Sequence, residues 1–289
     1  MDVSIIIVNY NTKDLTLDCL KSIYHFTENI KFEVILVDNN SHDDSVEFIR
    51  NFFPQVRLIE STENLGFGRA NNLGFNYACG KYIFLLNSDT YLLNNAIKIF
   101  YDYMETCKKN IACVGTMLTD KNGFVVHSYG KYIRISILMK NIVRTIFQIP
   151  TPYLDVSQKS FPLEVEVIIG ADLFIRRSVI DELGFFDPRF FMYHEENDLQ
   201  KRYGDAGYKK VILTEPTIVH LEGKSSKKFN TLIRESTFIY LKKWNNWAIY
   251  YLYRIIYALG HSFIIFKRSM PWSDRKKSFA VCFYNVKKN

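Results

Sequence analysis

The sequence predicts an α/β protein with a doubly wound, mostly parallel sheet flanked by helices. Short apolar runs typical of buried strands recur along the first 220 or so residues, and segments with helical periodicity separate them. Such alternation is typical of parallel strands joined by crossover helices. The composition, 48% hydrophobic and 23% charged, allows a packed core and argues against global disorder.

The first hundred residues carry the clearest pattern. The runs that we interpret as buried strands lie at 3–10, 32–37, 56–59 and 82–86. Helices are predicted over 14–26, over 43–53 and from the glycine-rich run 63–74 to Gly80. Asn11 and Thr12 suit the start of the first helix, and Pro54 stops the second.

The pattern continues after residue 95, with one less legible region. Further strands are expected at 111–115, 165–176, 208–213 and 216–220, and further helices at 96–107, 177–183 and 195–204. Asp120 to Gly123 reads as a turn. Residues 133–149 could form an amphipathic helix lying against lipid or against the body of the protein.

The connection after the first strand excludes two common nucleotide-binding motifs. It reads Asn9-Tyr10-Asn11-Thr12 and contains no glycine, so neither a dinucleotide fingerprint nor a P-loop is present there. Gly66 and Gly68 form a G-x-G, but this is weak evidence and follows the third predicted strand.

Polar residues end the fourth predicted strand. The apolar run of residues 82–86 stops at Asn87-Ser88-Asp89. Open α/β sheets bind ligands beyond the carboxyl ends of their strands, and two oxygen donors two residues apart suit a hard divalent cation. An Asx-turn that merely closes the strand is an equally good interpretation of this tripeptide.

A cluster of acids opens the helix predicted at 195–204. Glu195, Glu196 and Asp198 lie in its first turn, where carboxylates complement a helix N-terminus. Asp198 and Arg202 are four residues apart and can pair. Glu196 is offset from that face and points elsewhere.

The spacing of the cysteines and the distribution of charge exclude several classes of protein. None of the five cysteines forms a C-x-x-C pair, so neither a zinc site nor a disulfide framework is indicated, and a reducing compartment is expected. The N-terminal apolar run is too short for a signal peptide. Residues 1–223 hold 23 Lys and Arg against 28 Asp and Glu, whereas residues 224–289 hold 14 against 2. This distribution argues against a nucleic-acid binder and favours contact of the tail with an anionic membrane surface.

The stretch 247–266 has one formal charge, Arg254, and is long enough to span a bilayer. Arg254, His261 and Arg268 are seven apart, in register with Trp247, and would form one polar stripe. The four tyrosines between 250 and 257 suit the membrane interface. A helix lying in the membrane plane or docked on it is the favoured interpretation, ahead of a true span and of a core helix.

Four blocks of this sequence together resemble the inverting family 2 glycosyltransferases with the GT-A fold, in particular their rhamnosyltransferase-like branch. They are VSIIIVNYN at 3–11, VDNNSHDDS at 37–45, NLGFGRANNLG with FLLNSDT within 64–90, and GADLFIRR through TIVHLEGKS within 170–225. The resemblance implies a GT-A domain at 1–225 and a basic, aromatic, helical, membrane-associated tail at 226–289.

The resemblance also implies roles for individual residues. Asp89 and His220 would bind a divalent cation, Mn²⁺ or Mg²⁺. Glu196 would be the catalytic base, with Asp198 as the second candidate, and Asp172 and Glu195 would contact the acceptor. The nucleotide sugar would be bound by Asn9, Asp38, Ser41, Asp43, Gly68, Arg69, Asn72, Asn87 and Ser88. The sequence departs from the family pattern in having Asn87 where an acid is usual and Glu196 where Asp is usual.

The implied function is inverting, metal-dependent transfer of a hexose from dTDP-rhamnose or a UDP-sugar to a glycan or lipid-linked oligosaccharide in cell-surface polysaccharide synthesis. The expected location is cytoplasmic, peripheral at the inner face of the cell membrane, and a homodimer is a candidate assembly. Two alternatives stay open, a non-catalytic subunit that binds a nucleotide sugar and a sugar-phosphate nucleotidyltransferase.

Overall fold

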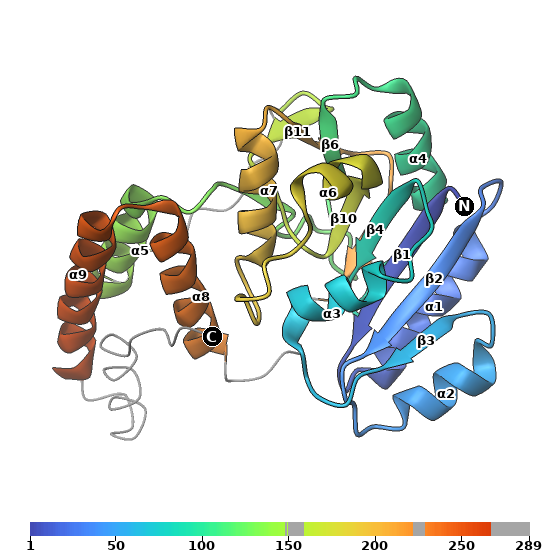
Figure 1. Ribbon diagram of the computed structural model, residues 1–289, viewed down its shortest axis with the longest axis horizontal. Helices are drawn as coiled ribbons and strands as arrows, with labels where there is room; N and C mark the ends of the chain where they lie inside the picture. Colours follow the sequence, from blue (N-terminus) through green and yellow to red (C-terminus); the bar gives the residue numbers. More distant parts are fainter. Residues whose placement is uncertain (148, 150–158, 222–228, 267–289) are drawn as a thin grey trace. The chain divides into compact units, whose positions relative to one another are not determined.

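Figure 1 shows a computed structural model of the chain, and the structure describes residues 1–147, 149, 159–221 and 229–266. The chain divides into two compact units. The sheet unit consists of Met1–Tyr132, Ser157–Phe191 and Glu195–Lys224. The helical unit consists of Ile133–Val156, Met192–His194 and Ser225–Asn289.

The sheet unit is built on an eight-stranded sheet of order β3-β2-β1-β4-β10-β6-β11-β8 (Figure 1). Its strands in chain order are β1 (Val3–Asn9), β2 (Phe32–Asp38), β3 (Arg57–Glu60), β4 (Tyr82–Leu86), β6 (Ile111–Thr116), β8 (Leu163–Val165), β10 (Asp172–Arg176) and β11 (Lys209–Leu213). β10 is antiparallel to both of its neighbours and β8 is antiparallel to β11, while the other pairs are parallel. The predicted mostly parallel sheet is therefore confirmed.

Two small strand pairs flank the large sheet. β5 (Thr90–Leu92) pairs with β12 (Ile218–His220), and β7 (Tyr129–Gly130) pairs with β9 (Val167–Ile168). The expectation of one strand over 165–176 is wrong, because this range contains the end of β8, all of β9 and all of β10. β8 and β10 belong to the large sheet, whereas β9 pairs outside it. β5 and β7 were not predicted, since runs of two or three residues show no periodicity.

Helices cover both faces of the sheet because strand side chains alternate between faces. α1 (Lys13–Phe26) and α4 (Ala96–Thr106) share a core with Ile5, Ile7 and Phe84. α3 (Gly66–Phe75) lies on the other face, where a Cβ added at Gly74 would meet Ile6. The remaining helices of this unit are α2 (Ser45–Phe52), α6 (Arg177–Leu183) and α7 (Glu195–Asp205).

The third helix is shorter than predicted. We expected it to continue to Gly80, but it ends at Phe75. Tight turns replace it, with the Tyr77 amide donating to the Gly74 carbonyl over 3.0 Å and the Ala78 amide donating to the Phe75 carbonyl over 3.1 Å.

The helical unit contains α5 (Ile135–Phe147), α8 (Phe229–Trp244) and α9 (Trp247–Phe266). Phe238 and Leu241 of α8 form a small core with Tyr250 and Tyr253 of α9. Partly buried side chains from α5 and α9 pack against this core, namely Ile135, Leu138 and Tyr257. None of the helices among the described residues is both long and apolar enough to cross a membrane.

Candidate active site

The carboxyl ends of β1, β2 and β4 meet at one edge of the sheet. β1 lies between β2 and β4 and is parallel to both, and Asn9 is paired with Asp38 in register. The tripeptide Asn87-Ser88-Asp89 follows β4 at the same edge. Since ligands of open α/β sheets bind beyond this edge, it is the first place to look for a site.

Asn9 and Asp38 organise the loop that follows β2. The Asn9 amide nitrogen donates to Asp38 Oδ1 over 2.7 Å and to Ser41 Oγ over 3.0 Å. The Ser41 backbone N–H donates to Asp38 Oδ2 over 2.9 Å. Asp38 is only 2% exposed, so both of its carboxylate oxygens are used within the protein. These bonds fix the conformation of the loop.

Hydroxyl groups connect the end of β1 to the end of β4. Asn9 Oδ1 accepts hydrogen bonds from the hydroxyls of Thr12, at 2.8 Å, and Thr16, at 2.7 Å. The Thr12 hydroxyl also lies 3.0 Å from that of Ser88. Thr12 occupies the N-cap position of α1, but its side chain makes no capping bond. Our sequence interpretation missed this link because threonine near a helix start is usually a cap.

Asp43 fixes the loop between β2 and α2 from its other end. One carboxylate oxygen accepts from the backbone N–H of Lys13 over 2.9 Å, at the start of α1, and the other accepts from the N–H and hydroxyl of Ser45. Partial burial raises the pKa of Asp43, but these hydrogen bonds outweigh it and leave the pKa below its usual value.

Asp89 and His220 come together although 131 positions separate them. The small β5–β12 pair places His220 opposite Thr90, the residue after Asp89. Asp89 Oδ1 then lies 3.3 Å from His220 Nε2, and the Leu221 amide donates to the Asp89 carbonyl over 2.9 Å. The Asp89 side chain is 24% exposed and that of His220 10%. The pair therefore presents one carboxylate and one imidazole near the sheet edge.

Asn87 takes part in a strand-end turn through its backbone. Its carbonyl accepts from the amide of Thr90 over 3.2 Å and from the Thr90 hydroxyl over 2.7 Å, and its own amide donates to the Ala171 carbonyl over 3.0 Å. The turn is formed by the backbone carbonyl of Asn87, whereas the Asx-turn considered from the sequence would need its side-chain oxygen as acceptor. The backbone turn and the Asp89–His220 pair occur together.

Three residues expected to line a nucleotide pocket have close neighbours within the protein. Asn72 donates to the Phe186 carbonyl over 2.8 Å and accepts from the Phe186 amide over 3.1 Å. A Cβ added at Gly68 would lie 3.2 Å from Phe186 Cβ, and Arg69 donates to the Leu65 carbonyl. Their predicted role toward the nucleotide stays a prediction.

Gly66 has a clear structural reason to be glycine. Its φ is +77°, and an added Cβ would lie 2.0 Å from the Phe191 carbonyl oxygen. The neighbouring Phe67 amide donates to the same carbonyl over 2.8 Å. The start of α3 therefore holds the end of the segment that leads toward α7.

The acids of α7 have different surroundings. Asp198 is fully buried and lies 3.3 Å from Arg202, as predicted from their spacing. Arg202 also donates to the carbonyls of Leu183, Gly184 and Phe185, so this ion pair clamps the α6–α7 connection. Glu196 is only partly buried. Of the two candidates for the base, Glu196 is the more accessible.

Two further acids are buried without full hydrogen bonding. Asp172 accepts from the Thr116 amide over 2.6 Å, and its other oxygen has no donor within the described residues. Glu195 is 4% exposed, and its Oε2 also lacks a donor there. Burial raises the pKa of both groups well above its usual value, and for Glu195 the charge of Glu196 adds to the effect. Contact of either with an acceptor stays a prediction.

The three residues before α7 belong to the helical unit and bond to α8. The Ser236 hydroxyl donates to the Met192 carbonyl over 2.6 Å, and the Thr237 hydroxyl lies 3.0 Å from His194 Nε2. Burial lowers the pKa of His194 to about 4. Tyr193 has a φ of +69° and His194 a φ of +67°. A positive φ costs free energy in residues with large side chains.

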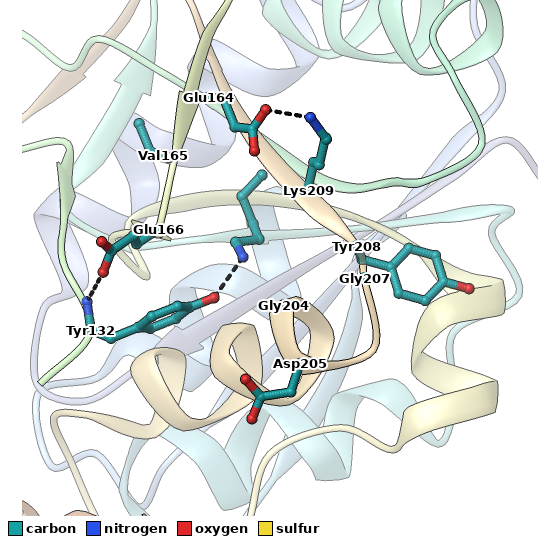
Figure 2. Close-up of a pocket in the computed structure, with 10 residues that line it drawn as sticks. Tyr132, Glu164, Val165, Glu166, Gly204, Asp205, Gly207, Tyr208 and Lys209 are labelled. Atoms are coloured by element: carbon teal, nitrogen blue, oxygen red, sulfur yellow. Dashed lines mark hydrogen bonds and ion pairs between the residues drawn. The ribbon is translucent and has the colours of Figure 1, made fainter.

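A pocket of about 500 Å³ lies at the other end of the sheet, at the start of β11 and the end of α7 (Figure 2). The Lys210 ammonium donates to the Tyr132 hydroxyl over 2.6 Å, and Lys209 is paired with Glu164 at 2.7 Å. Burial lowers the pKa of Lys210. None of the site residues predicted from the sequence lines this pocket.

Gln200 is a structural residue that the sequence did not reveal. Its side-chain amide donates to the Ile168 carbonyl over 2.7 Å and accepts from the Ile168 amide over 2.8 Å, so it binds β9 as a neighbouring strand would. A glutamine inside a helix gives no signal for such a contact.

The chain matches the family model described as glycosyl transferase family 2 over residues 4–184. It is 26% identical over 227 residues to the N-acetylglucosaminyl-diphospho-decaprenol L-rhamnosyltransferase of Mycobacterium tuberculosis, covering 72% of this chain and 74% of the relative. It is 32% identical over 116 residues to the poly(ribitol-phosphate) beta-glucosyltransferase of Bacillus spizizenii, covering 38% of this chain and 18% of that protein.

Several solved structures have a fold similar to that of this chain. The structure of GalNAc-T7 with UDP, GalNAc and Mn²⁺ aligns with a TM-score of 0.63 at 16% identity, over 97% of this chain and 53% of that one. The mannosyltransferase PcManGT from Pyrobaculum calidifontis, in complex with GDP-Man and Mn²⁺, aligns with a TM-score of 0.54 at 14% identity, over 97% and 85%. The sheet unit therefore has the predicted GT-A fold. Because the family match covers more than half of the chain, this protein belongs to glycosyl transferase family 2 and is a glycosyltransferase.

Proposed function

We propose that this glycosyltransferase moves a sugar from a nucleoside-diphosphate sugar to a hydroxyl group of a glycan or lipid-linked oligosaccharide, inverting the anomeric carbon. dTDP-rhamnose or a UDP-sugar is the proposed donor, and a cell-surface polysaccharide is the proposed product. The mycobacterial relative, whose name states rhamnosyl transfer to a diphospho-decaprenol-linked acceptor, supports this choice of substrates.

The observation that carries the proposal is the Asp89–His220 pair near the carboxyl edge of the sheet. A carboxylate oxygen and an imidazole nitrogen 3.3 Å apart are both ligands that Mn²⁺ accepts, and carboxylate also suits Mg²⁺. No group of three or more His, Cys, Asp or Glu side chains suited to a metal occurs among the described residues. Two protein ligands fit a cation that is shared with a bound diphosphate, since such ions commonly take one or two carboxylates and complete their shell with phosphate oxygens and water.

The proposed roles follow from the charge changes in the reaction. When bound, a divalent cation neutralises the charge that develops on the departing diphosphate. Glu196 removes the proton of the acceptor hydroxyl as that oxygen forms its bond to C1 of the sugar. The bond from C1 to the diphosphate oxygen breaks on the opposite face of the ring, so a single displacement inverts C1. Asn9, Asp38, Ser41 and Asp43 hold the loop that contacts the nucleotide.

The proposed location is cytoplasmic, peripheral at the inner face of the cell membrane. Nucleotide sugars are formed in water, whereas a lipid-linked acceptor stays in the bilayer, so an enzyme joining the two works at the interface. The strongly basic C-terminal segment supports this location.

A binding and transfer experiment tests the function. The purified full chain is screened by thermal shift against dTDP-rhamnose, UDP-sugars and GDP-sugars with Mn²⁺, with Mg²⁺ and with EDTA. We expect one donor to raise the unfolding temperature only when a divalent cation is present. The anomeric configuration of the transferred sugar is then read by NMR. Metal-independent stabilisation would contradict the cation site, and a retained configuration would contradict single displacement.

A further inference from the structure

One face of α9 is apolar and exposed. Trp247, Tyr251, Leu252 and Ile255 are 77%, 52%, 53% and 58% exposed. Their spacing of four, five and eight residues from Trp247 places them along one side of the helix. Tyr250 and Tyr253, by contrast, are buried against α8. We call the exposed set the α9 face.

The only formal charge expected within this helix turns away from the α9 face. Arg254 lies over the rings of Phe238 and Tyr250, with its guanidinium carbon 5.8 Å and 5.6 Å from their centroids, and it donates to the Tyr250 hydroxyl over 3.3 Å. Of the predicted polar stripe, Arg254 thus contacts the helical core, whereas Trp247 in the same register lies on the α9 face. The side chain of His261, and Arg268, lie outside the described residues.

A second helix of the same unit adds exposed apolar side chains. Val143 and Phe147 of α5 are 44% and 71% exposed. Exposed Lys140 lies on the same side of α5, three and seven residues before them. Ile135 and Leu138 instead pack on the core of the helical unit. One side of α5 therefore packs against the core of the helical unit, and another side exposes apolar groups together with a cation.

The part of the sequence around α9 is rich in basic residues. Lys242 and Lys243 lie in the last turn of α8, directly before α9, and Lys242 is exposed. Beyond α9, residues 267–289 contain seven Lys and Arg and one Asp in the sequence. Large exposed apolar groups within a strongly basic part of the sequence are the composition of a segment that binds an anionic lipid interface.

We propose that the α9 face docks in the interfacial layer of an anionic membrane, with Trp247 and Tyr251 at the level of the headgroups. Positive charge near the helix favours an anionic bilayer over a second copy of the same basic unit, because two copies would repel each other. A tryptophan and a tyrosine on the exposed side suit the amphipathic headgroup region. The inference extends the proposed location but does not depend on the donor, the metal or the base.

The test uses the full chain and vesicles of phosphatidylcholine alone or mixed with phosphatidylglycerol. We compare the wild type with the double variant Trp247→Ser, Ile255→Ser. Its matched control is Phe52→Ser, Phe124→Ser, which removes two aromatic side chains that are each 67% exposed in the sheet unit. Co-sedimentation should show binding of the wild type to the anionic vesicles. The α9 variant should bind at least about tenfold more weakly, and the control should bind as the wild type does.

Two results would overturn the inference. One is unchanged vesicle binding by the α9 variant. The other is a wild-type dimer in analytical ultracentrifugation without lipid that the α9 variant abolishes, which would assign the face to a contact between copies. Thermal stabilisation by donor and cation is measured on the same variants. It should be unchanged, so a failure of docking is distinguishable from a failure of the proposed transferase function.

Discussion

Two sets of acids at or near the carboxyl edge of the sheet are held in different ways. In the loop set, Asp38 and Asp43 each accept hydrogen bonds at both carboxylate oxygens from neighbouring protein groups. In the reactive set, Asp89 faces a histidine and is partly exposed, and Glu195 has a buried oxygen with no donor among the described residues. Protein donors satisfy both oxygens of each acid in the first set, whereas we expect a cation, a proton or a substrate to stabilise the second set. Such incomplete satisfaction is more common at functional sites than in scaffolds.

Substitution of the proposed base is the strongest test of this difference. Glu196→Gln should lower the rate of transfer by about 10²- to 10⁴-fold, because the amide cannot accept the acceptor's proton. Donor stabilisation in the thermal-shift assay should stay as in the wild type. Asp198→Asn is the comparison, and it should lower the unfolding temperature because it weakens the ion pair with Arg202. Near-normal turnover by Glu196→Gln would refute the assignment.

The proposed cation site gives the next largest effect. Asp89→Asn should reduce transfer at a fixed Mn²⁺ concentration by about 100-fold, since the ligand loses its charge. Higher Mn²⁺ should restore part of the activity, which a titration would measure. Asp43→Asn, from the loop set, should shift thermal stability and leave the midpoint of the Mn²⁺ titration unchanged. The same titration midpoint for Asp89→Asn and wild type would remove Asp89 from the site.

A substitution in the loop set should lower the free energy of unfolding. Asp38→Asn places an amide N–H₂ against one of two donors, the Asn9 amide or the Ser41 N–H, and should cost about 1–3 kcal/mol in the free energy of unfolding. The exposed neighbour substitution Asp44→Asn should change it by less than about 0.5 kcal/mol. Urea denaturation measures both. Equal stability of the two variants would mean that the hydrogen bonds of Asp38 are not what holds the loop.

Asp172 should show the smallest and most pH-dependent effect. Its raised pKa means that the unfolded chain loses this proton at lower pH than the folded chain does, so the residue's contribution to stability falls as pH rises above about 4. Asp172→Asn lacks this titration. The variant should gain stability relative to the wild type as the pH rises from 5 to 8, measured by denaturation at both values. A difference that does not change with pH would show that Asp172 is ionised in the folded protein.

The sequence predicted the elements that carry a long periodic signal. α9 begins at the predicted residue, and β1, β2 and β4 differ from their predicted ranges by no more than one residue. The short strand β5 was not predicted, and it is the partner of β12 in the pair that brings Asp89 and His220 together. The antiparallel direction of β10 could not be predicted either. The sequence of a short buried strand does not indicate whether it runs parallel or antiparallel to its neighbours.

The candidate site was predictable in its residue types and less so in its contacts. Asn9, Asp38, Ser41 and Ser88 come together as strand-end residues should, because parallel strands deliver their carboxyl ends to one edge. Asn72 is different, since its choice of the Phe186 backbone as a partner depends on tertiary packing. The sequence around Asn72 does not indicate that its side chain bonds to a residue 114 positions away.

The place of β10 has a consequence for how the chain folds. β10 lies between β4 and β6, yet it is synthesised about 55 residues after β6 ends. Until it arrives, β4 and β6 each have an unpaired edge, and edges of buried apolar strands are templates for aggregation. Pairings of this sequence separation also close late and slowly. A fragment that ends before residue 172 should therefore aggregate when expressed, whereas one that includes β10 and α6 gains the strand that joins the two halves of the sheet.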